Sequence, residues 1–421
     1  MAYLFKQSIV LIPLTLFFVF LVLVLRLKYA IIIWLSSYHF DLVAMLDSSG
    51  IESISFNFLR LLVIPSVVYL RIVHAEKLTF HYNKSLIYAV SGVLVLTLSS
   101  SILSGLHIEA VKQYIYLLNF VISYFILQKV LSKDWLNNSY IYLIFFPLVF
   151  AILQTYFLGH YYGGVNNQRF TTFTSPQTYA LYLVVLFILI NDYSKRKGAK
   201  EYLFLIIILI QLLLTGSRYS LILFGATFIL DFMTLKRLKL KISTLLIIVA
   251  TVVGVLGIGS DAISKLRGLD FIASSNSASV TEIGTIKFRV AIWLFMFNDF
   301  MNSSVFYQAV GQGICSTGTL MIEMMPAYTE ANMDYNRIAH NEFLRVIYEF
   351  GVIGIIVFVA FLWRLSSTIK SEFTLMLKFS IILIGALSIE NIFAASGGPS
   401  GVALVLMYTG ILNKIQVQED C

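Results

Sequence analysis

A polar segment passes into an apolar run between residues 339 and 357. The polar segment, AHNEFLR at 339–345, gathers a histidine, an amide and two opposite charges, and the apolar run FGVIGIIV follows at 350–357. Such a run is typical of a helix that enters a membrane, so the polar residues are expected at a membrane surface. Ionisable groups held there usually have a function. Residues 339–345 are therefore the first candidate for a functional site.

The composition of the chain is that of a membrane protein. Of its 421 residues, 59% are hydrophobic and only 12% are charged. The mean hydropathy is +0.86, which lies outside the range of soluble globular domains. We predict an all-α polytopic membrane protein with about 12 transmembrane helices. The expected spans are 8–25, 56–73, 85–103, 110–130, 139–158, 177–191, 201–215, 217–234, 242–259, 346–363, 373–391 and 399–414.

Basic residues in the short loops set the expected orientation. Lys and Arg cluster at 195–200 and at 236–241, whereas the loop 38–55 holds acidic residues and no Lys or Arg. Because Lys and Arg favour cytoplasmic loops, the two clusters are expected inside and 38–55 outside. Alternation of the spans then places 159–176 and 260–345 outside.

The chain is expected to divide into three parts. These are an N-terminal transmembrane bundle at 1–259, an outer loop region at 260–345 and C-terminal transmembrane helices at 346–421. Arg26 and Lys28 interrupt the first apolar run and leave two topologies open. Either the first helix leaves the cytoplasm and 29–37 lies in the outer interface, or 29–37 is a second short span and the N-terminus is outside. We prefer the first, which puts both termini inside.

The sequence does not suggest a metal site or a nucleotide-binding loop. The two cysteines fall on opposite sides of the membrane in the expected topology, and the six histidines show no pairing at ligand spacing. A phosphate-binding glycine loop and a dinucleotide fingerprint are both missing from the sequence, which argues against an ATP-driven pump. The net charge of +8 is explained by anchoring of the inner loops. We therefore expect no metal, no cofactor and no nucleic-acid partner.

The outer region 260–345 is expected to be partly helical and folded back over the membrane domain. Residues 288–297 read FRVAIWLFMF, an apolar density that suits a helix in or on the interface. The sequence GQG at 311–313 predicts a turn after it. Such a segment could roof a cavity.

Four basic side chains are expected at the outer face. Arg169 precedes a span, Arg218 closes the tight outer turn TGSR at 215–218, and Arg289 and His340 come from the outer loop. Arginine binds phosphate oxygens bidentately and keeps its proton. Three guanidiniums and one imidazole at one face therefore form a candidate clamp for a phosphorylated lipid.

The order of these motifs resembles that of the O-antigen ligase and polymerase superfamily of bacterial envelope enzymes, over roughly residues 130–410. The matching motifs are Gly216-Ser217-Arg218, Arg289 with Trp293 and the Gly-x-Gly at 311–313, and His340-Asn341 before Glu349-x-Gly351-x-x-Gly354. The run 169–180 is similar to the family's Arg-x-x-Gly-x-Phe-x-x-Pro-Asn-x-x-Ala. It departs from that pattern with Thr172 for Gly and Gln177 for Asn.

The resemblance implies a GT-C-like glycosyltransferase of lipopolysaccharide biosynthesis, in the bacterial inner membrane, with its site facing the periplasm. Such an enzyme moves a glycan from undecaprenyl pyrophosphate to an acceptor hydroxyl. The acceptor is another lipid-linked repeat unit in a polymerase and the lipid A core in a ligase. We favour the polymerase, because Thr172 and Gln177 fit a divergent member. The implied partners are the lipid-linked donor and acceptor, membrane lipids, and a chain-length regulator protein as a further candidate.

The same resemblance suggests a role for each candidate residue. Arg218, Arg289 and Arg169 would bind the donor pyrophosphate, since fixed cations offset the charge that grows on a leaving group. His340 would accept the proton of the acceptor hydroxyl, and Asn341 and Arg345 would support it. A single displacement of this kind, without a metal, would invert the anomeric centre.

Simpler roles are open for the same residues. Arginines at helix ends often only reach the interface, and Asn341 is a candidate helix cap. Arg345 and Glu349 stand at the spacing of an intrahelical ion pair, which is our default expectation for them. The alternative function is a transporter of the same lipid. It would need charges at mid-membrane and repeated halves, but the candidate charges gather at one face.

Overall fold

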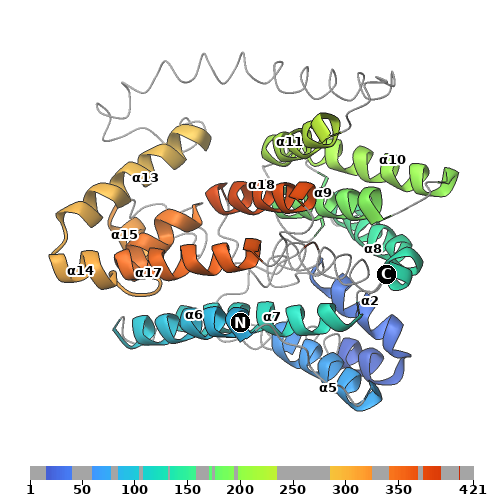
Figure 1. Cartoon of the computed structure of the whole chain (residues 1–421), viewed down its shortest axis with the longest axis horizontal. Coiled ribbons are helices and arrows are strands. Elements are labelled where there is room, and N and C mark those ends of the chain that lie inside the picture. Colours follow the sequence, from blue (N-terminus) through green and yellow to red (C-terminus); the bar gives the residue numbers. More distant parts are fainter. Residues whose placement is uncertain are drawn as a thin grey trace.

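The structure of this chain is a computed structural model, and the part that it describes is helical. The described residues are 16–39, 59–76, 84–103, 108–130, 133–157, 170–172, 176–193, 198–234, 285–324, 341–367, 373–389 and 407. Within these ranges every regular element is a helix and no strand occurs (Figure 1). The all-α prediction is confirmed for this part. The expected spans 242–259 and 399–414 lie outside it, apart from Met407.

The helices follow the apolar runs of the sequence. Their bounds are α2 Leu27–Ser37, η1 Leu59–Val63, α5 Ile64–Glu76, α6 Lys84–Leu103, α7 Ile108–Val130, α8 Lys133–Ile152, η2 Leu153–Phe157, α9 Pro176–Tyr193, α10 Ala199–Leu214, α11 Arg218–Thr234, α13 Thr285–Asn302, α14 Val305–Val310, α15 Ser316–Met324, α17 Glu342–Ser367 and α18 Phe373–Ile389. Among the described residues, two stretches, Ser139–Tyr156 and Glu342–Trp363, are long and apolar enough to cross a membrane. The expected number of spans stays a prediction.

Helix α9 is the centre of one group of helices. Every residue from Tyr179 to Leu186 is buried, as expected for a helix that is apolar on all sides. It packs against α8, α10 and α11, and α11 in turn packs against α18. Gly385 permits that last contact, because a Cβ there would lie 2.5 Å from a methyl carbon of Leu223. A buried ion pair of 2.8 Å between Lys378 Nζ and Asp192 Oδ2 also joins α18 to α9.

Helix α17 has the most widespread contacts with helices α13–α15, α6 and α18 among the elements of its group. It lies along α6 (Figure 1), and it also packs against α13, α14, α15 and α18. The helix is kinked at Gly351, whose φ of 66° and ψ of −165° are not helical. The kink separates the polar first half of α17, 342–350, from its apolar second half.

Helix α2 bears on the two N-terminal topologies. Its Trp34 Nε1 donates a hydrogen bond of 2.9 Å to the Tyr38 hydroxyl, which donates one of 2.6 Å to Asn119 Oδ1 of α7. All three side chains are buried, and α2 packs on α5 and α8. Residues 29–37 are therefore part of the packed bundle under either topology.

Candidate functional site

Helix α17 begins inside the polar stretch 339–345, and Asn341 caps it. The backbone N–H of Leu344 donates to Asn341 Oδ1 at 3.1 Å, and that of Arg345 donates to the Asn341 carbonyl at 3.0 Å. A side-chain oxygen here satisfies an N–H group that has no partner within the helix. The simpler role considered for Asn341, that of a helix cap, is thus confirmed. His340, which directly precedes the cap, lies outside the described residues.

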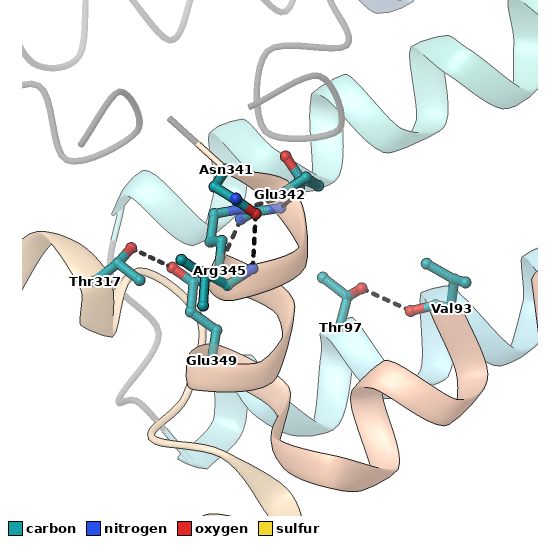
Figure 2. A network of polar contacts seen from close by, with 8 residues as sticks. Val93, Thr97, Thr317, Asn341, Glu342, Arg345 and Glu349 are labelled. Carbon is teal, nitrogen blue, oxygen red and sulfur yellow. Dashed lines mark hydrogen bonds and ion pairs between the residues drawn. The ribbon is translucent and has the colours of Figure 1, made fainter. Parts of the chain in front are cut away.

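Arg345 is buried between two carboxylates of its own helix (Figure 2). Its Nε donates to Glu342 Oε1 at 2.9 Å and its Nη1 donates to Glu349 Oε2 at 3.0 Å, while Nη2 also contacts Glu342 Oε1. The arginine is 5% exposed and both glutamates are 0% exposed. The expected pair of Arg345 with Glu349 is confirmed, and Glu342 is a further partner. Because breaking a buried pair costs about 3–5 kcal/mol, Arg345 is poorly placed to bind a phosphate.

This cluster of Glu342, Arg345 and Glu349, which we call the acidic triad, holds two carboxylates for one guanidinium. Glu349 Oε1 also accepts a hydrogen bond of 2.6 Å from the Thr317 hydroxyl of α15. Glu342 Oε2 is buried and has no partner among the described residues. A buried carboxylate oxygen without a donor is costly. Among the described residues, the triad therefore places an acceptor oxygen without a donor, and not a cation without a partner, close to the start of α17.

The turn at 311–313 docks on the kink of α17. The backbone N–H of Gln312 donates to the Tyr348 carbonyl at 2.9 Å, and that of Gly313 donates to the Glu349 carbonyl at 3.0 Å. The kink at Gly351 leaves these carbonyls without their usual partners four residues on, and the turn supplies the missing donors. The predicted turn is confirmed, and it lies against the helix that follows His340.

Two glycines make this docking possible. Gly311 has a φ of 86°, and a Cβ there would lie 2.3 Å from the Glu349 carbonyl oxygen. Gly351 has a φ of 66°, and a Cβ there would lie 2.3 Å from the Ala309 carbonyl oxygen. Both positions need a left-handed backbone as well as space for a second backbone. The Gly-x-Gly motif and the Glu349-x-Gly351 motif therefore form one contact.

Helices α13 and α15 pack on the polar half of α17. Ile292, Met296 and Phe300 of α13 form a buried apolar cluster with Leu320 of α15 and Tyr348 of α17. The Tyr348 hydroxyl also donates a hydrogen bond of 2.7 Å to Asp299 Oδ2. Residues 285–324 thus fold back on α17, and the placement of this segment on the outer side of a membrane stays a prediction. Position 289 belongs to α13, but the side chain of Arg289 is outside the described part.

Arg218 is the first residue of α11 and follows the tight turn that the sequence predicts. Gly216 takes a φ of 60°, and the Ser217 hydroxyl donates to that of Ser220 at 3.0 Å. The backbone N–H of Phe170 donates to the Leu214 carbonyl at 3.3 Å, at the end of α10. The turn before Arg218 therefore lies beside the residue that follows Arg169, although Arg169 itself and the Arg218 side chain are not described.

The candidate residues come from two groups of helices. Arg289 and Asn341 belong to the group around α17, because α13 packs on α17. Arg218 belongs to the group around α9, because α11 packs on α9, α10 and α18. Helix α18 contacts both α11 and α17 and so connects the two groups. The side chains of the four expected clamp residues, Arg169, Arg218, Arg289 and His340, lie outside the described part, so the clamp stays a prediction.

An apolar groove runs beside the acidic triad. It lies between α6, α7 and α17, and Glu342 and Arg345 contribute the charged groups among its lining residues. The other lining residues include Val93, Leu96, Phe120, Phe350, Phe358 and Phe361. Walls of this kind suit a hydrocarbon chain, and the triad gives the groove one polar end.

Sequence reasoning missed the buried surroundings of these motifs. Charges at 342, 345 and 349 fall on one face of a helix, so local spacing could have revealed the triad. No local signal points to Thr317, which lies 32 positions from Glu349 in the chain. Such partners follow from the tertiary fold alone.

Comparison with known proteins supports one family. No curated protein matches the chain significantly. The sequence model of the family described as O-antigen ligase matches residues 203–359, which run from α10 to the second half of α17. The match includes Arg218, Arg289, the turn at 311–313 and the His340-Asn341 pair. Residues 203–359 therefore resemble an O-antigen ligase domain, which supports the resemblance of the chain to the O-antigen ligase and polymerase superfamily.

Proposed function

We propose that this protein is an inner-membrane glycosyltransferase that joins undecaprenyl-pyrophosphate-linked repeat units into O-antigen or a related surface polysaccharide. Members of its family transfer glycans and act on lipid-linked glycans. The observation that carries the proposal is the contact between the turn at 311–313 and the kink of α17. It joins the outer helices to the helix start at Asn341 within the matched domain.

The membrane arrangement in this proposal follows the loop charges. About 12 spans in a GT-C-like bundle would place the region 260–345 on the periplasmic side, between the parts 1–259 and 346–421. The apolar helices and the family match support a membrane location. The groove beside α17 offers a place for a lipid chain.

The donor pyrophosphate is assigned to Arg218, Arg289 and Arg169. Two of these positions, 218 and 289, lie within the matched domain. Undecaprenyl pyrophosphate is a good leaving group, so the main task is to offset its growing charge with fixed cations. Arg345 is not assigned to this task, because two carboxylates already hold it.

The proton acceptor is assigned to His340. It stands two residues before Glu342 in the chain, so their Cα atoms are at most about 7.6 Å apart. The acidic triad has an excess of carboxylates, and nearby negative charge stabilises an imidazolium once it has taken a proton. Arg345 and Asn341 support this arrangement, the first by holding Glu342 and the second by starting the helix.

The reaction is then a single displacement. The acceptor hydroxyl attacks the anomeric carbon while its proton passes to the imidazole of His340. The bond between that carbon and the pyrophosphate oxygen breaks, and undecaprenyl pyrophosphate leaves. Attack from the opposite face inverts the anomeric centre, and no metal ion is needed in this scheme.

Ligation to the lipid A core is the second candidate, because the matched family is described as O-antigen ligase. The two activities share the donor and the chemistry and differ in the acceptor. A deletion strain separates them. Lipopolysaccharide capped with one repeat unit identifies a polymerase, and intact core without any O-antigen identifies a ligase.

A transferase is tested against a transporter with purified protein. In detergent, where no compartments exist, the protein is incubated with an undecaprenyl-pyrophosphate oligosaccharide and the lipid-linked products are separated by size. Chain extension, or transfer to added lipid A core, supports the proposal. If the protein binds the lipid but forms no product with either acceptor, the transferase proposal is wrong.

A further inference from the structure

The segment 170–172 and the α10–α11 turn meet at one point of the fold. Phe170 directly follows Arg169 in the chain, and its N–H donates to the Leu214 carbonyl at 3.3 Å. Arg218 follows Leu214 by four residues, around the turn at Gly216. Consecutive Cα atoms are about 3.8 Å apart. This one hydrogen bond therefore constrains the distance between positions 169 and 218.

His39 packs next to the contact between segment 170–172 and the α10–α11 turn. It follows α2 in a turn and is 0% exposed. Its Nδ1 lies 3.5 Å from the Thr172 hydroxyl oxygen, a long hydrogen bond between the ring and the segment 170–172. The ring centroids of His39 and Tyr182 are 4.3 Å apart, and those of His39 and Tyr179 are 5.8 Å apart, both in edge-on geometry. The imidazole is thus wedged between α9 and the segment after Arg169.

Tyr179 carries the contact onward to the α10–α11 turn. Its hydroxyl donates to Gln211 Oε1 on α10, and its ring lies 6.4 Å from that of Phe170. The Gln211 carbonyl accepts the N–H of Thr215 at 3.1 Å, which closes the last turn of α10. A continuous chain of contacts therefore runs from His39 through Tyr179 and Gln211 to the turn before Arg218.

Packing alone does not explain an imidazole at position 39. Burial lowers the pKa of His39 to about 3, so the ring is neutral near pH 7. Its Nε2 has no hydrogen-bond partner among the described residues. A buried nitrogen without a partner costs stability, and a phenylalanine would fill the same space without that cost. The nitrogen that contacts Thr172 is the feature that a histidine adds here.

We infer that His39 is a positioning residue for the donor-phosphate site, because it fixes the segment that follows Arg169 against the turn that precedes Arg218. This inference rests on the proposed function, in which those two arginines bind the pyrophosphate. The ring does not touch the substrate. It acts through Thr172 on one side and through Tyr179 on the other.

The test measures binding of undecaprenyl pyrophosphate to the purified full chain in detergent. His39→Phe keeps the ring shape and removes the nitrogens, and we expect it to weaken binding about tenfold with an unchanged melting temperature. His39→Asn keeps a polar atom near the place of Nδ1 and should bind nearly as the wild type does. A purely packing role predicts the opposite order, with Phe tolerated better than Asn.

Double variants show which arginine's position is responsible for the loss of binding in His39→Phe. If His39 acts by placing Arg169, then His39→Phe with Arg169→Gln binds no more weakly than Arg169→Gln alone. Combined with Arg289→Gln, which lies on α13, the two losses should multiply. If His39 acts by placing Arg218, the same holds for the combination with Arg218→Gln. If the losses multiply with both Arg169→Gln and Arg218→Gln, or if His39→Phe binds normally, the inference is wrong. Should His39→Phe fail to fold, Thr172→Val removes the same contact and must give the same pattern.

The same measurements keep this inference apart from the proposed function. A wild-type protein that shows the expected pattern of binding but forms no glycan product would end the proposed function and leave the role of His39 standing. A wild-type protein that forms product while the losses multiply would end the role of His39 alone. If the wild type does not bind undecaprenyl pyrophosphate, both are wrong.

Discussion

Two kinds of arginine lie in the matched domain, and Arg218 and Arg345 represent them. Arg218 begins α11 at a tight turn in the matched domain, whereas Arg345 is buried between two glutamates. We propose that a guanidinium of the first kind binds a ligand, whereas one of the second kind stabilises its own helix. Substitutions at the two positions should therefore affect different properties.

Arg218→Lys keeps the positive charge and loses the planar fork. If Arg218 binds the pyrophosphate bidentately, the variant should lose at least about tenfold in glycan transfer while it inserts into the membrane normally. Arg237→Lys, in the expected inner loop, is the matched control and should keep its activity. Transfer is measured with the lipid-linked oligosaccharide in detergent. Full activity of Arg218→Lys would remove that residue from the clamp.

Arg345→Met should act on stability. It leaves Glu342 and Glu349 buried without their cation, which costs about 3–5 kcal/mol. Adding Glu342→Gln and Glu349→Gln removes the uncompensated charge and should restore part of the loss. The measurement is thermal unfolding in detergent. A variant that melts like the wild type and binds undecaprenyl pyrophosphate more weakly would show instead that Arg345 is a phosphate ligand.

Among the elements, the turn at 311–313 and the kink of α17 depend on each other. Gly311, Gly351 and Gly216 all have positive φ, but only the first two face another backbone, and a Cβ at Gly216 would meet nothing within 4 Å. Gly216→Ala should therefore cost only the backbone strain, about 1–2 kcal/mol. Gly311→Ala and Gly351→Ala should cost more, because the docked turn must also move.

Thermal unfolding of the three alanine variants measures this difference. The expected order has Gly216→Ala closest to the wild type and the other two clearly lower. The Gly311→Ala variant should also lose glycan transfer, because the outer helices no longer seat on α17. Equal melting temperatures for Gly216→Ala and Gly311→Ala would contradict the role assigned to the docked turn.

The helices themselves were predictable from the sequence, and their partners were not. Spans such as 85–103 and 373–391 coincide closely with α6 and α18, because long apolar runs have no stable alternative to a helix in lipid. Helix α17 begins at 342 and not at 346, since Glu342 and Arg345 neutralise each other within its first turns. A hydropathy pattern treats such charges as separate and therefore ends the helix too early.

In the candidate site, too, local features were predictable from the sequence and tertiary contacts were not. The Asn341 cap and the pair of Arg345 with Glu349 follow from spacings of three and four residues, which a sequence displays directly. The contact of His39 with Thr172 joins positions 133 apart, and only the fold brings them together. Local chemistry was therefore readable from the sequence, and the packing that holds it in place was not.

The proposed function requires one orientation of the whole chain in the membrane, with 260–345 on the periplasmic side. With the two native cysteines replaced, a cysteine placed at Ser279 should react with an impermeant thiol reagent from the periplasm. One placed at Ser194, beside the basic cluster at 195–200, should react only after the membrane is opened. The positive-inside rule is the physical reason for this expectation. The reverse pattern would put the proposed site on the cytoplasmic side and contradict the account.

The proposed mechanism is tested by the turnover of a purified undecaprenyl-pyrophosphate-linked repeat unit by the wild type and by His340→Ala. We expect the wild type to form extended or transferred glycan, with a pH profile that shows an ionisation in the histidine range. His340→Ala should lose about two to four orders of magnitude in rate while it still binds the donor. If His340→Ala keeps near-normal turnover, the proton acceptor is another group, such as Glu342, whose Oε2 has no partner among the described residues, and the proposed mechanism is wrong.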